Sequence, residues 1–508
     1  MFRYIDNFLN KITMYRLVLY VLITFFLMAV SLTFLGLLPY SPLSLVFSFF
    51  LITTICLITN IIFAWAFKVS TNVESVYITA FILVLIISPA RSVFDSLFFS
   101  LAIWSSILSM AFKYILAINK KHLFNPAAVA VAIVALFLGQ SASWWIGTMY
   151  MLPIILVGGF LITRKIRRFD LVLSFLIVAT ISTLFTYFPN WVDLFGNLKR
   201  LIDSTSLVFF ATVMLTEPLT MPPTRFLRII YASIVGFLFA PFVHIGSVYS
   251  TPELALVIGN IFSYLVSPKE RLTLTLKEVK KVANDTYDFI FKSDKKIKFK
   301  AGQYLEWTIP DSGADSRGNR RYFTLASSPT ESDVVIGVKF YPKPSSFKQK
   351  LLSMKEGATV IASQRAGEFI LPEDKNKKLV FIAGGIGVTP FRSIIQYLID
   401  KGERRNIIIF YSNKSFDDIA YKDIFDKAYE NLNIKTVYTL TDTQTPSSWT
   451  GNKGFIDTHM ISLEAPDFKE RVFYISGPHS MVTSFKDTLH KMNVPRSHIK
   501  VDFFPGFA

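Results

Sequence analysis

The stretch Leu379-Val380-Phe381-Ile382-Ala383-Gly384-Gly385-Ile386-Gly387-Val388-Thr389-Pro390 decides the fold of the second half of the chain. Its apolar run predicts a buried strand, its glycines predict a tight turn, and Thr389-Pro390 is typical of the start of a helix. The run Asn406–Tyr411 predicts the next strand. A strand, a glycine turn, a helix and a strand in this order favour nucleotide binding, because glycines let a phosphate approach the backbone and a helix N-terminus offers free amides.

The region before this stretch has a different pattern. Short alternating runs, such as Leu272–Leu276 and Val334–Phe340, are separated by turn residues. A period of two is typical of antiparallel strands and predicts a small antiparallel β-barrel at 272–374. The α/β nucleotide-binding domain then follows at 375–508.

The first half has the composition of a membrane protein. The chain is 52% hydrophobic, contains 49 Phe and has a mean hydropathy of +0.44, which is too apolar for a soluble protein. We expect residues 1–268 to form a polytopic α-helical membrane bundle of about ten spans. Several segments are shorter than the ~20 residues of a simple crossing helix, either because helices broken near Pro126, Pro153 and Pro218 line a buried site or because the segment ends lie a few residues away. The segments fall near Tyr15–Leu38, Leu43–Phe67, Val76–Ser88, Ser96–Ile118, Asn125–Leu138, Trp144–Ile162, Leu171–Phe188, Ser206–Leu215, Leu227–Phe242 and Glu253–Val266.

Charge orients this bundle. Basic residues cluster on one side of it, which is the cytoplasmic side by the positive-inside rule, although Lys199-Arg200 in an outer loop runs against this pattern. Both termini and the second half are then cytoplasmic in a multi-pass protein of the plasma membrane. The same rule and the anionic inner leaflet account for the net charge of +17 without a nucleic-acid partner. The clusters are Arg3, Lys11 and Arg16; Lys120 and Lys121; Arg164, Lys165, Arg167 and Arg168; Arg225 and Arg228; Lys269 and Arg271.

Several cofactors and reactions lack the residues that they need. Cys56 is the only cysteine, whereas an iron–sulfur cluster needs about four. The first half contains only His122 and His244, whereas a two-haem path needs two histidine pairs on facing helices. We therefore expect no haem, no iron–sulfur cluster and no metal site. Hydrolase and nucleotide-triphosphatase functions have no support, because neither a Gly-x-Ser-x-Gly elbow nor a Gly-Lys-Ser/Thr phosphate loop occurs.

A second motif, Arg321-Tyr322-Phe323-Thr324-Leu325-Ala326-Ser327, precedes the glycine turn. Together the two motifs resemble the ferredoxin–NADP reductase family over about 272–508. The resemblance implies FAD and either NADH or NADPH as cofactors, with the planar guanidinium of Arg321 on the flavin pyrophosphate. It also implies that Phe323 and Thr324 line the isoalloxazine ring and that Ser345 and Ser346 meet the second phosphate; Tyr322 is included among the cofactor-binding residues.

The stretch Tyr474–Met481 resembles the Cys-Gly-Pro-x-x-Met stretch of the same family. Ser476 stands where a cysteine commonly borders the nicotinamide. The terminus Asp502-Phe503-Phe504-Pro505-Gly506-Phe507-Ala508 resembles the acidic and aromatic end of the family, with Phe507 either a lid on the flavin or part of a frayed end. We expect Thr324, Ser476 and Phe507 to act in hydride transfer. The implied coenzyme-binding residues are Gly384, Gly385, Gly387, Thr389, Pro390, Gly477, Pro478 and Met481.

The choice between NADH and NADPH stays open at this point. Asn413, Lys414 and Arg405 are placed to approach an adenosine 2′-phosphate, whereas Asp417-Asp418 would repel a phosphate or suit a free ribose. The balance weakly favours NADH.

Two loops of the first half carry further motifs. One contains Phe124-Asn125-Pro126 and the other Thr216-Glu217-Pro218. They resemble the membrane protein family shared by Rnf-type electron-transport complexes and the sodium-pumping NADH:quinone reductase, over about 89–268. The resemblance implies FMN or another flavin in the membrane, with Asn125, Thr216 and Glu217 as candidate contacts. The alternative is that these residues only cap helices or lie in loops.

Members of that family carry a flavin mononucleotide esterified to a threonine in an outward-facing Ser-Gly-Ala-Thr-type motif. Gly139-Gln140-Ser141-Ala142-Ser143 stands at the matching place but lacks Gly-Ala-Thr. The hydroxyl of Ser143 could take the same phosphoester, and a plain polar loop is the alternative that we favour. A non-covalent flavin in the bundle is compatible with both.

These features predict a membrane-bound flavin oxidoreductase. Electrons would pass from cytoplasmic NAD(P)H through FAD into a membrane cofactor, and then to a quinone, an extracytoplasmic acceptor or a partner subunit. One alternative is an FAD-dependent reductase of a soluble acceptor, such as ferredoxin or free flavin, that is merely anchored by helices. Another is a transporter whose reductase domain senses the redox state.

Overall fold

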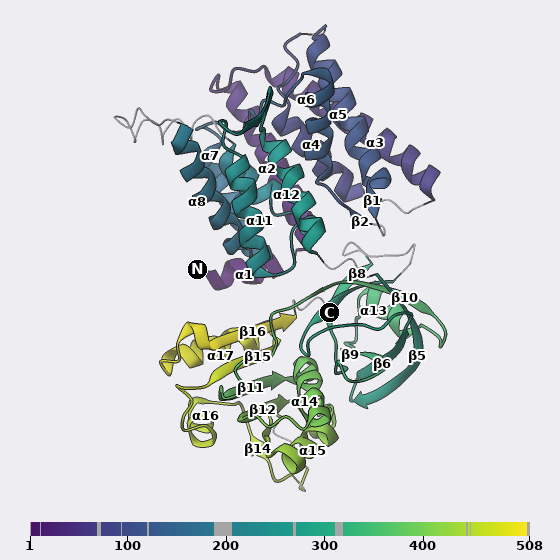
Figure 1. Ribbon diagram of the computed structural model, residues 1–508, viewed down its shortest axis with the longest axis vertical. Helices are drawn as coiled ribbons and strands as arrows, with labels where there is room; N and C mark the ends of the chain where they lie inside the picture. Colours follow the sequence, from purple (N-terminus) through teal and green to yellow (C-terminus); the bar gives the residue numbers. More distant parts are fainter. Residues whose placement is uncertain are drawn as a thin grey trace. The chain divides into compact units, whose positions relative to one another are not determined.

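The computed structural model describes residues 2–10, 12–68, 73–92, 94–118, 121–186, 206–267, 271–309, 319–442, 446–447 and 449–504. The chain forms two compact units, Met1–Ser267 and Pro268–Ala508, called here the N-terminal unit and the C-terminal unit. Figure 1 shows that the first is helical and the second contains two sheets.

The N-terminal unit is a bundle of apolar helices. Helix α3 packs against α4 and α5, α5 packs against α6, and α11 packs against α8 and α12. Two short hairpins, β1–β2 and β3–β4, lie in the connections. The helices are α1 (Phe2–Asn10), α2 (Met14–Phe34), α3 (Pro42–Phe67), α4 (Val73–Ile86), α5 (Ser96–Ile115), α6 (Pro126–Leu138), α7 (Leu152–Ile166), α8 (Phe169–Thr186), α10 (Leu207–Phe209), the π-helix η2 (Phe210–Met214), α11 (Arg225–Leu238) and α12 (Pro252–Val266); the hairpin strands are β1 (Ala117–Ile118), β2 (Lys121–His122), β3 (His244–Ile245) and β4 (Val248–Tyr249).

Three of the described helices, α2, α3 and α5, are long and apolar enough to cross a membrane. Four others, α4, α6, α8 and α12, are apolar but shorter. A helix rises 1.5 Å per residue, so the 13 residues of α6 cover only about 20 Å of a hydrocarbon core of about 30 Å. The expected number of about ten spans therefore stays a prediction.

The three prolines expected to break helices lie at helix ends. Pro126 occupies the first turn of α6 and Pro153 the first turn of α7. Pro218 follows the π-helix η2. Proline is tolerated at these places because the first turn of a helix has no carbonyl partner for its amides. The prolines therefore begin or follow short helices and interrupt none of those described.

The first sheet of the C-terminal unit contains six antiparallel strands in the order β8-β7-β10-β5-β6-β9. Its core includes the buried Phe289, Phe291 and Trp307. The sheet is curled: β8 and β9 are its edge strands, and the amide of Ala326, just after β8, donates to the carbonyl of Val335 in β9 at 2.8 Å. Its elements are β5 (Leu272–Ala283), β6 (Thr286–Ser293), β7 (Tyr304–Thr308), β8 (Arg320–Thr324), β9 (Val334–Lys339), α13 (Ser346–Leu352) and β10 (Thr359–Ala366).

This sheet corrects the expected barrel in one respect. The described strands form no ladder between β8 and β9, so the sheet is not closed by regular pairing. Isolated hydrogen bonds after the end of β8 join the two edges instead, because β8 ends at Thr324 before it can pair with β9. The alternating pattern predicted the antiparallel strands correctly, and barrel closure stays a prediction.

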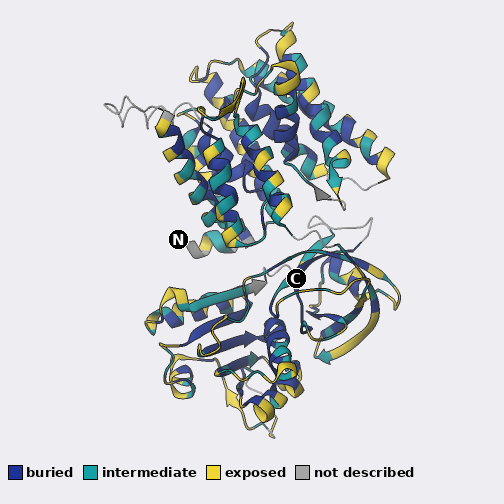
Figure 2. Ribbon diagram, in the orientation of Figure 1, coloured by how far each residue is buried: buried dark blue, intermediate teal, exposed yellow. Residues whose placement is uncertain are grey.

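The second sheet contains six parallel strands in the order β14-β13-β12-β11-β15-β16. Its central strands are buried, as the dark blue arrows of Figure 2 show. Helices α14 and α15 pack on one face, and α16 and α17 pack on the other. The elements are β11 (Leu379–Gly384), η3 (Gly385–Val388), α14 (Thr389–Lys401), β12 (Ile407–Asn413), η4 (Phe416–Asp418), α15 (Lys422–Leu432), β13 (Lys435–Leu440), β14 (Asn452–Lys453), α16 (Thr458–Glu464), β15 (Val472–Pro478), α17 (His479–Lys491), η5 (Arg496–His498) and β16 (Ile499–Phe504). The expected strand, glycine turn, helix and strand are confirmed.

Candidate functional site

The candidate site lies where the strand order of the parallel sheet reverses. The chain runs from β11 outward through β12 and β13 and later returns to the other side of β11 with β15. In open α/β sheets, ligands bind beyond the carboxyl ends of the strands at this point of reversal. Gly384 ends β11 and Pro478 ends β15, so both coenzyme motifs stand at the place that the topology favours.

The glycines bring these two motifs into contact. A Cβ atom on Gly384 would lie 2.0 Å from Sδ of Met481, and one on Gly387 would lie 2.5 Å from Cα of Gly477. Gly385 differs from both, because its φ is +51° and a Cβ there would meet nothing within 4 Å. Two glycines are thus needed for packing, whereas Gly385 leaves the outer side of the turn open.

Helix α14 begins directly after this turn. Thr389 donates its hydroxyl to the carbonyl of Ile386 at 3.2 Å, and Pro390 stands in the first turn. Val388 is the N-cap residue and supplies no side-chain cap. The first amides of this 13-residue helix therefore face the turn with the partial positive charge of a helix N-terminus.

A second group of predicted residues gathers around Phe347 on α13. The Arg321 guanidinium carbon lies 5.4 Å from the centre of the Phe347 ring, and the ring of Phe323 lies 5.8 Å from it. Ser345 caps α13, and its hydroxyl accepts the amide of Lys348 at 3.4 Å, while Ser346 begins the helix next to Phe347. The structure thus brings together the four residues that were predicted for the flavin phosphates and one ring face. Phe347 itself was missed, since nothing in the local sequence marks an aromatic residue on a short helix.

Tyr322 points away from this group. Successive side chains of a strand alternate between its faces, so Arg321 and Phe323 share one face and Tyr322 lies on the other. The hydroxyl of Tyr322 donates to the Glu306 carboxylate at 2.9 Å, and its ring lies half exposed against that of Tyr304.

Asp502 links the two residues predicted to act in hydride transfer. The hydroxyl of Thr324 is in hydrogen-bonding contact with the Asp502 carboxylate, and Asp502 of β16 is the register partner of Ser476 of β15. Burial raises the pKa of Asp502 to about 6, against the opposing effect of the Thr324 hydrogen bond. Ser476 is fully buried, and its Oγ has no hydrogen-bond partner in the part of the chain that the structure describes.

Asp502 was not assigned a role from the sequence. The signal was present, because the acidic residue stands a few positions before the aromatic terminus. Its partners come from β8 and β15, which are distant in the chain. Phe507 lies outside the described residues, so its role as a lid stays a prediction.

The structure corrects one expectation about the adenosine end of the coenzyme. Arg405 stands before the start of β12, at the edge of the sheet opposite the glycine turn, where it pairs with Glu403 at 2.7 Å. It therefore cannot approach a phosphate at the carboxyl edge. Asn413 is buried at that edge, at the end of β12. The carboxylate of Asp418 is bonded to Lys339 at 2.7 Å and to the hydroxyl of Ser415 at 2.9 Å.

Comparison with known proteins agrees with this geometry. A family model described as the oxidoreductase NAD-binding domain matches residues 381–487. The oxidoreductase NAD-binding domain-containing protein 1 of Pongo abelii is 30% identical over 233 residues, which cover 41% of this chain and 71% of that protein. The chain belongs to this oxidoreductase family.

Two further relatives of the oxidoreductase are longer than the matched region. The flavohemoprotein of Candida albicans is 29% identical over 40% of this chain and 50% of its own length. The F subunit of the Na(+)-translocating NADH-quinone reductase of Methylococcus capsulatus is 29% identical over 37% of this chain and 49% of its own length. The chain thus spans about half the length of these curated relatives. Its C-terminal unit contains an NAD-binding oxidoreductase domain of the ferredoxin–NADP reductase family.

In the N-terminal unit of the oxidoreductase, the two predicted motif loops are connected by polar contacts. The side chain of Asn125 accepts the amide of Ala128 at 3.1 Å and so caps α6. Its own backbone amide donates to Oδ1 of Asn260 at 2.9 Å, and Nδ2 of Asn260 donates to the hydroxyl of Tyr231 at 3.1 Å. Glu217 interacts electrostatically with both Tyr231 and Lys113.

Thr216 is fixed by its own helix. Its buried hydroxyl donates to the carbonyl of Thr212 at 2.7 Å. The adjacent Glu217 accepts the hydroxyl of Thr220 at 3.4 Å. These local bonds agree with the alternative that Thr216 and Asn125 serve their helix ends, while Glu217 adds a charge to the polar cluster around Tyr231.

Ser143 lies apart from this cluster. Its exposed hydroxyl donates to the carbonyl of Ile86 at 3.2 Å and accepts the hydroxyl of Ser88 at 2.7 Å. Ile86 is the last residue of α4, whereas Lys113 bonds to Ser75 in its first turn at 2.9 Å. The 14 residues of α4 cover about 21 Å at 1.5 Å per residue, so the Ser143 loop and the polar cluster lie at opposite ends of this helix.

Proposed function

We propose that the chain transfers electrons from NAD(P)H to FAD in its C-terminal unit and onward into its N-terminal, membrane-embedded unit. The observation that carries the first step is the contact between the glycine turn and Gly477 at the point where the parallel sheet reverses its strand order. The observation that supports the second is the presence of three helices long and apolar enough to cross a membrane in the same chain.

The residues around Phe347 fit the flavin. Arg321 offers planar, charged donors for a pyrophosphate, and Ser345 and Ser346 offer hydroxyls at the start of α13. Phe323 presents its ring beside that of Phe347 and so an apolar wall for one face of the isoalloxazine. When bound, FAD supplies acceptance of a hydride and release of single electrons.

The residues at the carboxyl edge fit a nicotinamide coenzyme. The open side of Gly385 and the first amides of α14 would receive the pyrophosphate, while Gly477 and Pro478 flank the nicotinamide. The buried Ser476 hydroxyl would then find in the nicotinamide carboxamide the partner that the protein does not give it.

Thr324 and Asp502 would handle a proton beside the flavin. The pKa of Asp502, raised to about 6 by burial, allows its carboxyl group to hold or release a proton near neutral pH. The Thr324 hydroxyl lies against this carboxylate and would orient toward the reacting edge of the ring.

We assign NADH as the coenzyme. A 2′-phosphate needs cations at the carboxyl edge of the sheet, and Arg405 lies at the opposite edge. Lys339 is paired with Asp418. The amide of Asn413, at the end of β12, suits a ribose diol because it carries both a donor and an acceptor.

The membrane step rests on the polar cluster of Asn125, Asn260, Tyr231, Glu217 and Lys113. Ionisable residues buried among membrane helices are costly and commonly mark functional sites. We propose that this cluster borders a non-covalently held flavin, and that Ser143 belongs to a polar loop at the other end of α4. Quinone, an extracytoplasmic acceptor and a partner subunit are the candidate acceptors. The name of the Methylococcus capsulatus relative, an NADH-quinone reductase, supports quinone.

A reductase of a soluble acceptor, merely anchored by helices, is the second candidate function. The flavohemoprotein relative supports it, because its name indicates haem in the rest of that protein rather than a membrane acceptor. A bare anchor needs only one or two helices, whereas α2, α3 and α5 alone already exceed that number.

Reconstitution tests the proposed path. The full-length protein is placed in liposomes that contain a quinone in the bilayer or trap ferricyanide inside, and NADH is added outside. We expect NADH-dependent reduction of the quinone or of the trapped ferricyanide. Reduction of a soluble external acceptor alone, at the full rate of NADH oxidation, would favour the anchored reductase.

A further inference from the structure

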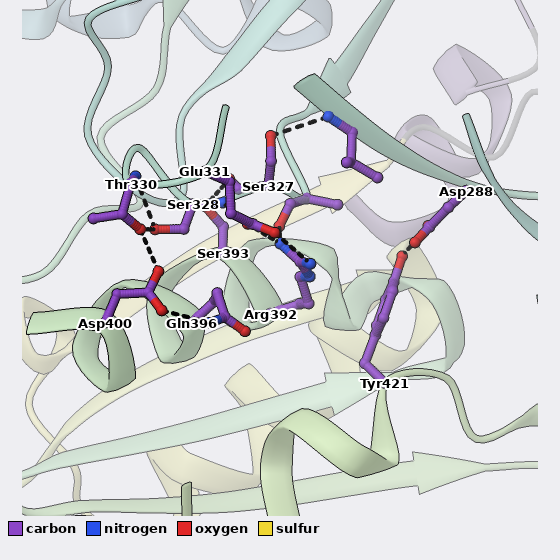
Figure 3. A network of polar contacts seen from close by, with 12 residues as sticks. Asp288, Ser327, Ser328, Thr330, Glu331, Arg392, Ser393, Gln396, Asp400 and Tyr421 are labelled. Carbon is purple, nitrogen blue, oxygen red and sulfur yellow. Dashed lines mark hydrogen bonds and ion pairs between the residues drawn. The ribbon is translucent and has the colours of Figure 1, made fainter. Parts of the chain in front are cut away.

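The segment that follows the flavin strand is bonded to the helix that follows the glycine turn. Ser327–Glu331 continues the chain from β8, and α14 continues it from the turn at Gly387. Figure 3 shows the polar side chains of both segments pointing toward one another. We call their contacts the coupling network. Its members are Ser327, Ser328, Thr330 and Glu331 on the segment and Arg392, Ser393, Gln396 and Asp400 on α14.

Arg392 is the centre of the coupling network. Its guanidinium forms a two-point ion pair with the Glu331 carboxylate, in which Nη2 donates to Oε1 at 2.9 Å. Nη1 also donates to the carbonyl of Ala326 at 3.0 Å. The Arg392 side chain is only 11% exposed, so solvent and salt screen this pair far less than they screen a surface ion pair.

Ser393 makes the second bond across the interface. It is fully buried, and its hydroxyl donates to the carbonyl of Ser327 at 2.7 Å. The Ser327 hydroxyl in turn accepts the amide of Val335 in β9 at 3.0 Å. The bond therefore reaches from α14 into both edges of the curled sheet.

The outer end of the coupling network holds the tip of the segment. The hydroxyl of Thr330 bonds to the Asp400 carboxylate, whose other oxygen accepts Nε2 of Gln396 at 2.7 Å. The amide of Ser328 donates to Glu331 at 2.5 Å. Each polar side chain of the segment thus has a defined place against α14.

A separate contact fixes the same two sheets from another side. Tyr421 donates its hydroxyl to the buried carboxylate of Asp288 in β6 at 2.5 Å. A Cβ atom on Gly337 of β9 would lie 2.4 Å from that hydroxyl. The guanidinium carbon of Arg392 lies 5.9 Å from the centre of the Tyr421 ring, so this contact adjoins the coupling network.

The spacing along the chain gives these bonds a mechanical role. Ala326 and Ser327 follow Thr324 by two and three residues, and Arg392 follows Thr389 by three residues. Both sides of the interface are therefore bonded within one turn of the residues proposed to contact the flavin and the coenzyme. Hydride transfer requires reacting atoms about 3–3.5 Å apart, and a displacement of about 1 Å can slow it about a hundredfold.

We propose that Arg392 and Ser393 are positioning residues that set the distance between the nicotinamide and the flavin. The inference rests on the proposed function, because it presupposes hydride transfer from NADH to FAD in the C-terminal unit. Neither residue needs to touch a cofactor. They act by holding the strand that ends at Thr324 against the helix that begins at Thr389.

The test is a rapid-reaction measurement on the full-length protein in detergent. The rate of FAD reduction at saturating NADH, the Kd of NADH, the FAD content and the isotope effect with NADH deuterated at the transferred position are measured for Arg392→Gln and Ser393→Ala. Arg404→Gln is the matched control, because Arg404 is an exposed arginine one residue beyond Glu403. Arg392→Lys keeps the charge and removes the two-point geometry.

We expect the limiting rate to fall at least tenfold in Arg392→Gln and about threefold in Ser393→Ala, with FAD content and the Kd of NADH within twofold of wild type, since a lost two-point charged contact has the larger effect. Arg392→Lys should recover part of the rate. The isotope effect should rise as hydride transfer limits the reaction more fully. The double variant Arg392→Gln/Glu331→Gln should be no slower than Arg392→Gln alone.

Two results would overturn the proposal. One is an unchanged limiting rate, with or without a change in the Kd of NADH. The other is loss of FAD from both variants, which would make the coupling network an element of stability only. A wild-type protein whose bound FAD is not reduced by NADH or NADPH would overturn the proposed function itself, and this outcome is visible before any variant is made.

Discussion

At the scale of single residues, the contacts that complete the site come from outside the motifs. The Arg321 motif and the Ser476 motif are visible in the sequence, but Asp502 joins them and Phe347 supports the first. Arg405 shows the converse, because its position two residues before β12 reads like a phosphate contact and the fold places it at the wrong edge. Sequence identifies the chemistry of a residue, whereas the strand order decides which residues meet.

Asp502→Asn should remove a pH dependence from flavin reduction. The pKa of Asp502 is about 6, so the carboxylate is charged above that pH and neutral below it. A negative charge beside Thr324 opposes the arrival of a hydride, and we expect the limiting rate to rise about fivefold, the equivalent of about 1 kcal/mol, as the pH falls from 8 to 5.5. The variant should hold the higher rate throughout, as measured by stopped-flow absorbance.

Exposed Asp487 supplies the control. Asp487→Asn should keep the wild-type profile. If Asp502→Asn also kept it, the titrating group would lie elsewhere and the proposed proton handling would be wrong.

At the scale of elements, the strand and helix starts of the C-terminal unit were predictable, but the contacts between its sheets were not. The apolar run from Leu379 and the start of α14 at Thr389 follow from local chemistry, and the structure has both. The bond from Ser393 to Ser327 joins residues 66 positions apart, so no local pattern reveals it. The same reason explains why the alternation predicted antiparallel strands without showing how the edges β8 and β9 meet.

The glycine turn offers a prediction at this scale. Gly387→Ala would place a Cβ 2.5 Å from the backbone of Gly477 and of Ser476, and backbone cannot move aside without shifting β15. We expect a loss of about 1–3 kcal/mol in stability, seen as a lower thermal midpoint, and weaker NADH binding.

Gly384→Ala provides a comparison, because its Cβ would collide with the flexible end of Met481. The double variant Gly384→Ala/Met481→Ala should recover most of the thermal midpoint. Equal tolerance of both single alanine variants would contradict the packing described here.

The contact between Asp288 and Tyr421 predicts a pH dependence of stability. Burial raises the pKa of Asp288 to about 6, and the charged or titratable groups that face it are Tyr421, Arg392, Lys280 and Glu331. Folding therefore favours the protonated acid. This contribution is fully present below the unfolded pKa near 4 and is lost as the pH rises through 6, by an amount of about 2–3 kcal/mol.

Asp288→Asn should remove this contribution while its amide oxygen still accepts the Tyr421 hydroxyl. The fall in the thermal midpoint of the full-length protein between pH 4.5 and pH 7 should be smaller in this variant than in wild type or in Asp487→Asn. An unchanged fall would show that Asp288 is already ionised at the lower pH.

At the scale of the whole molecule, the sequence separates two units more clearly than it counts membrane spans. The change from apolar to alternating sequence near Ser267 coincides with the boundary between the two units. The number of spans was harder to predict, because helices such as α6 and α12 are apolar but too short to cross alone. Composition reports burial, and both a lipid-facing helix and a short helix buried among others satisfy it.

The polar cluster of the N-terminal unit gives the short helices a purpose. Asn125 and Glu217 each stand directly before a proline in different loops, yet Asn125 is joined to Tyr231 through Asn260, and Glu217 interacts with Tyr231 electrostatically. A chain that served only to anchor a reductase would not need buried polar contacts of this kind. The central claim is therefore that a second flavin lies in this unit and is reduced through the first.

An anaerobic titration of the full-length protein with NADH tests that claim most directly. The flavin is extracted and counted, and the absorbance change at each addition gives the equivalents reduced per chain. We expect two flavins per chain in the wild type, both reduced, and in Arg321→Ala one retained flavin that NADH no longer reduces. A wild-type protein with a single FAD per chain, reduced by one equivalent of NADH, would contradict the account.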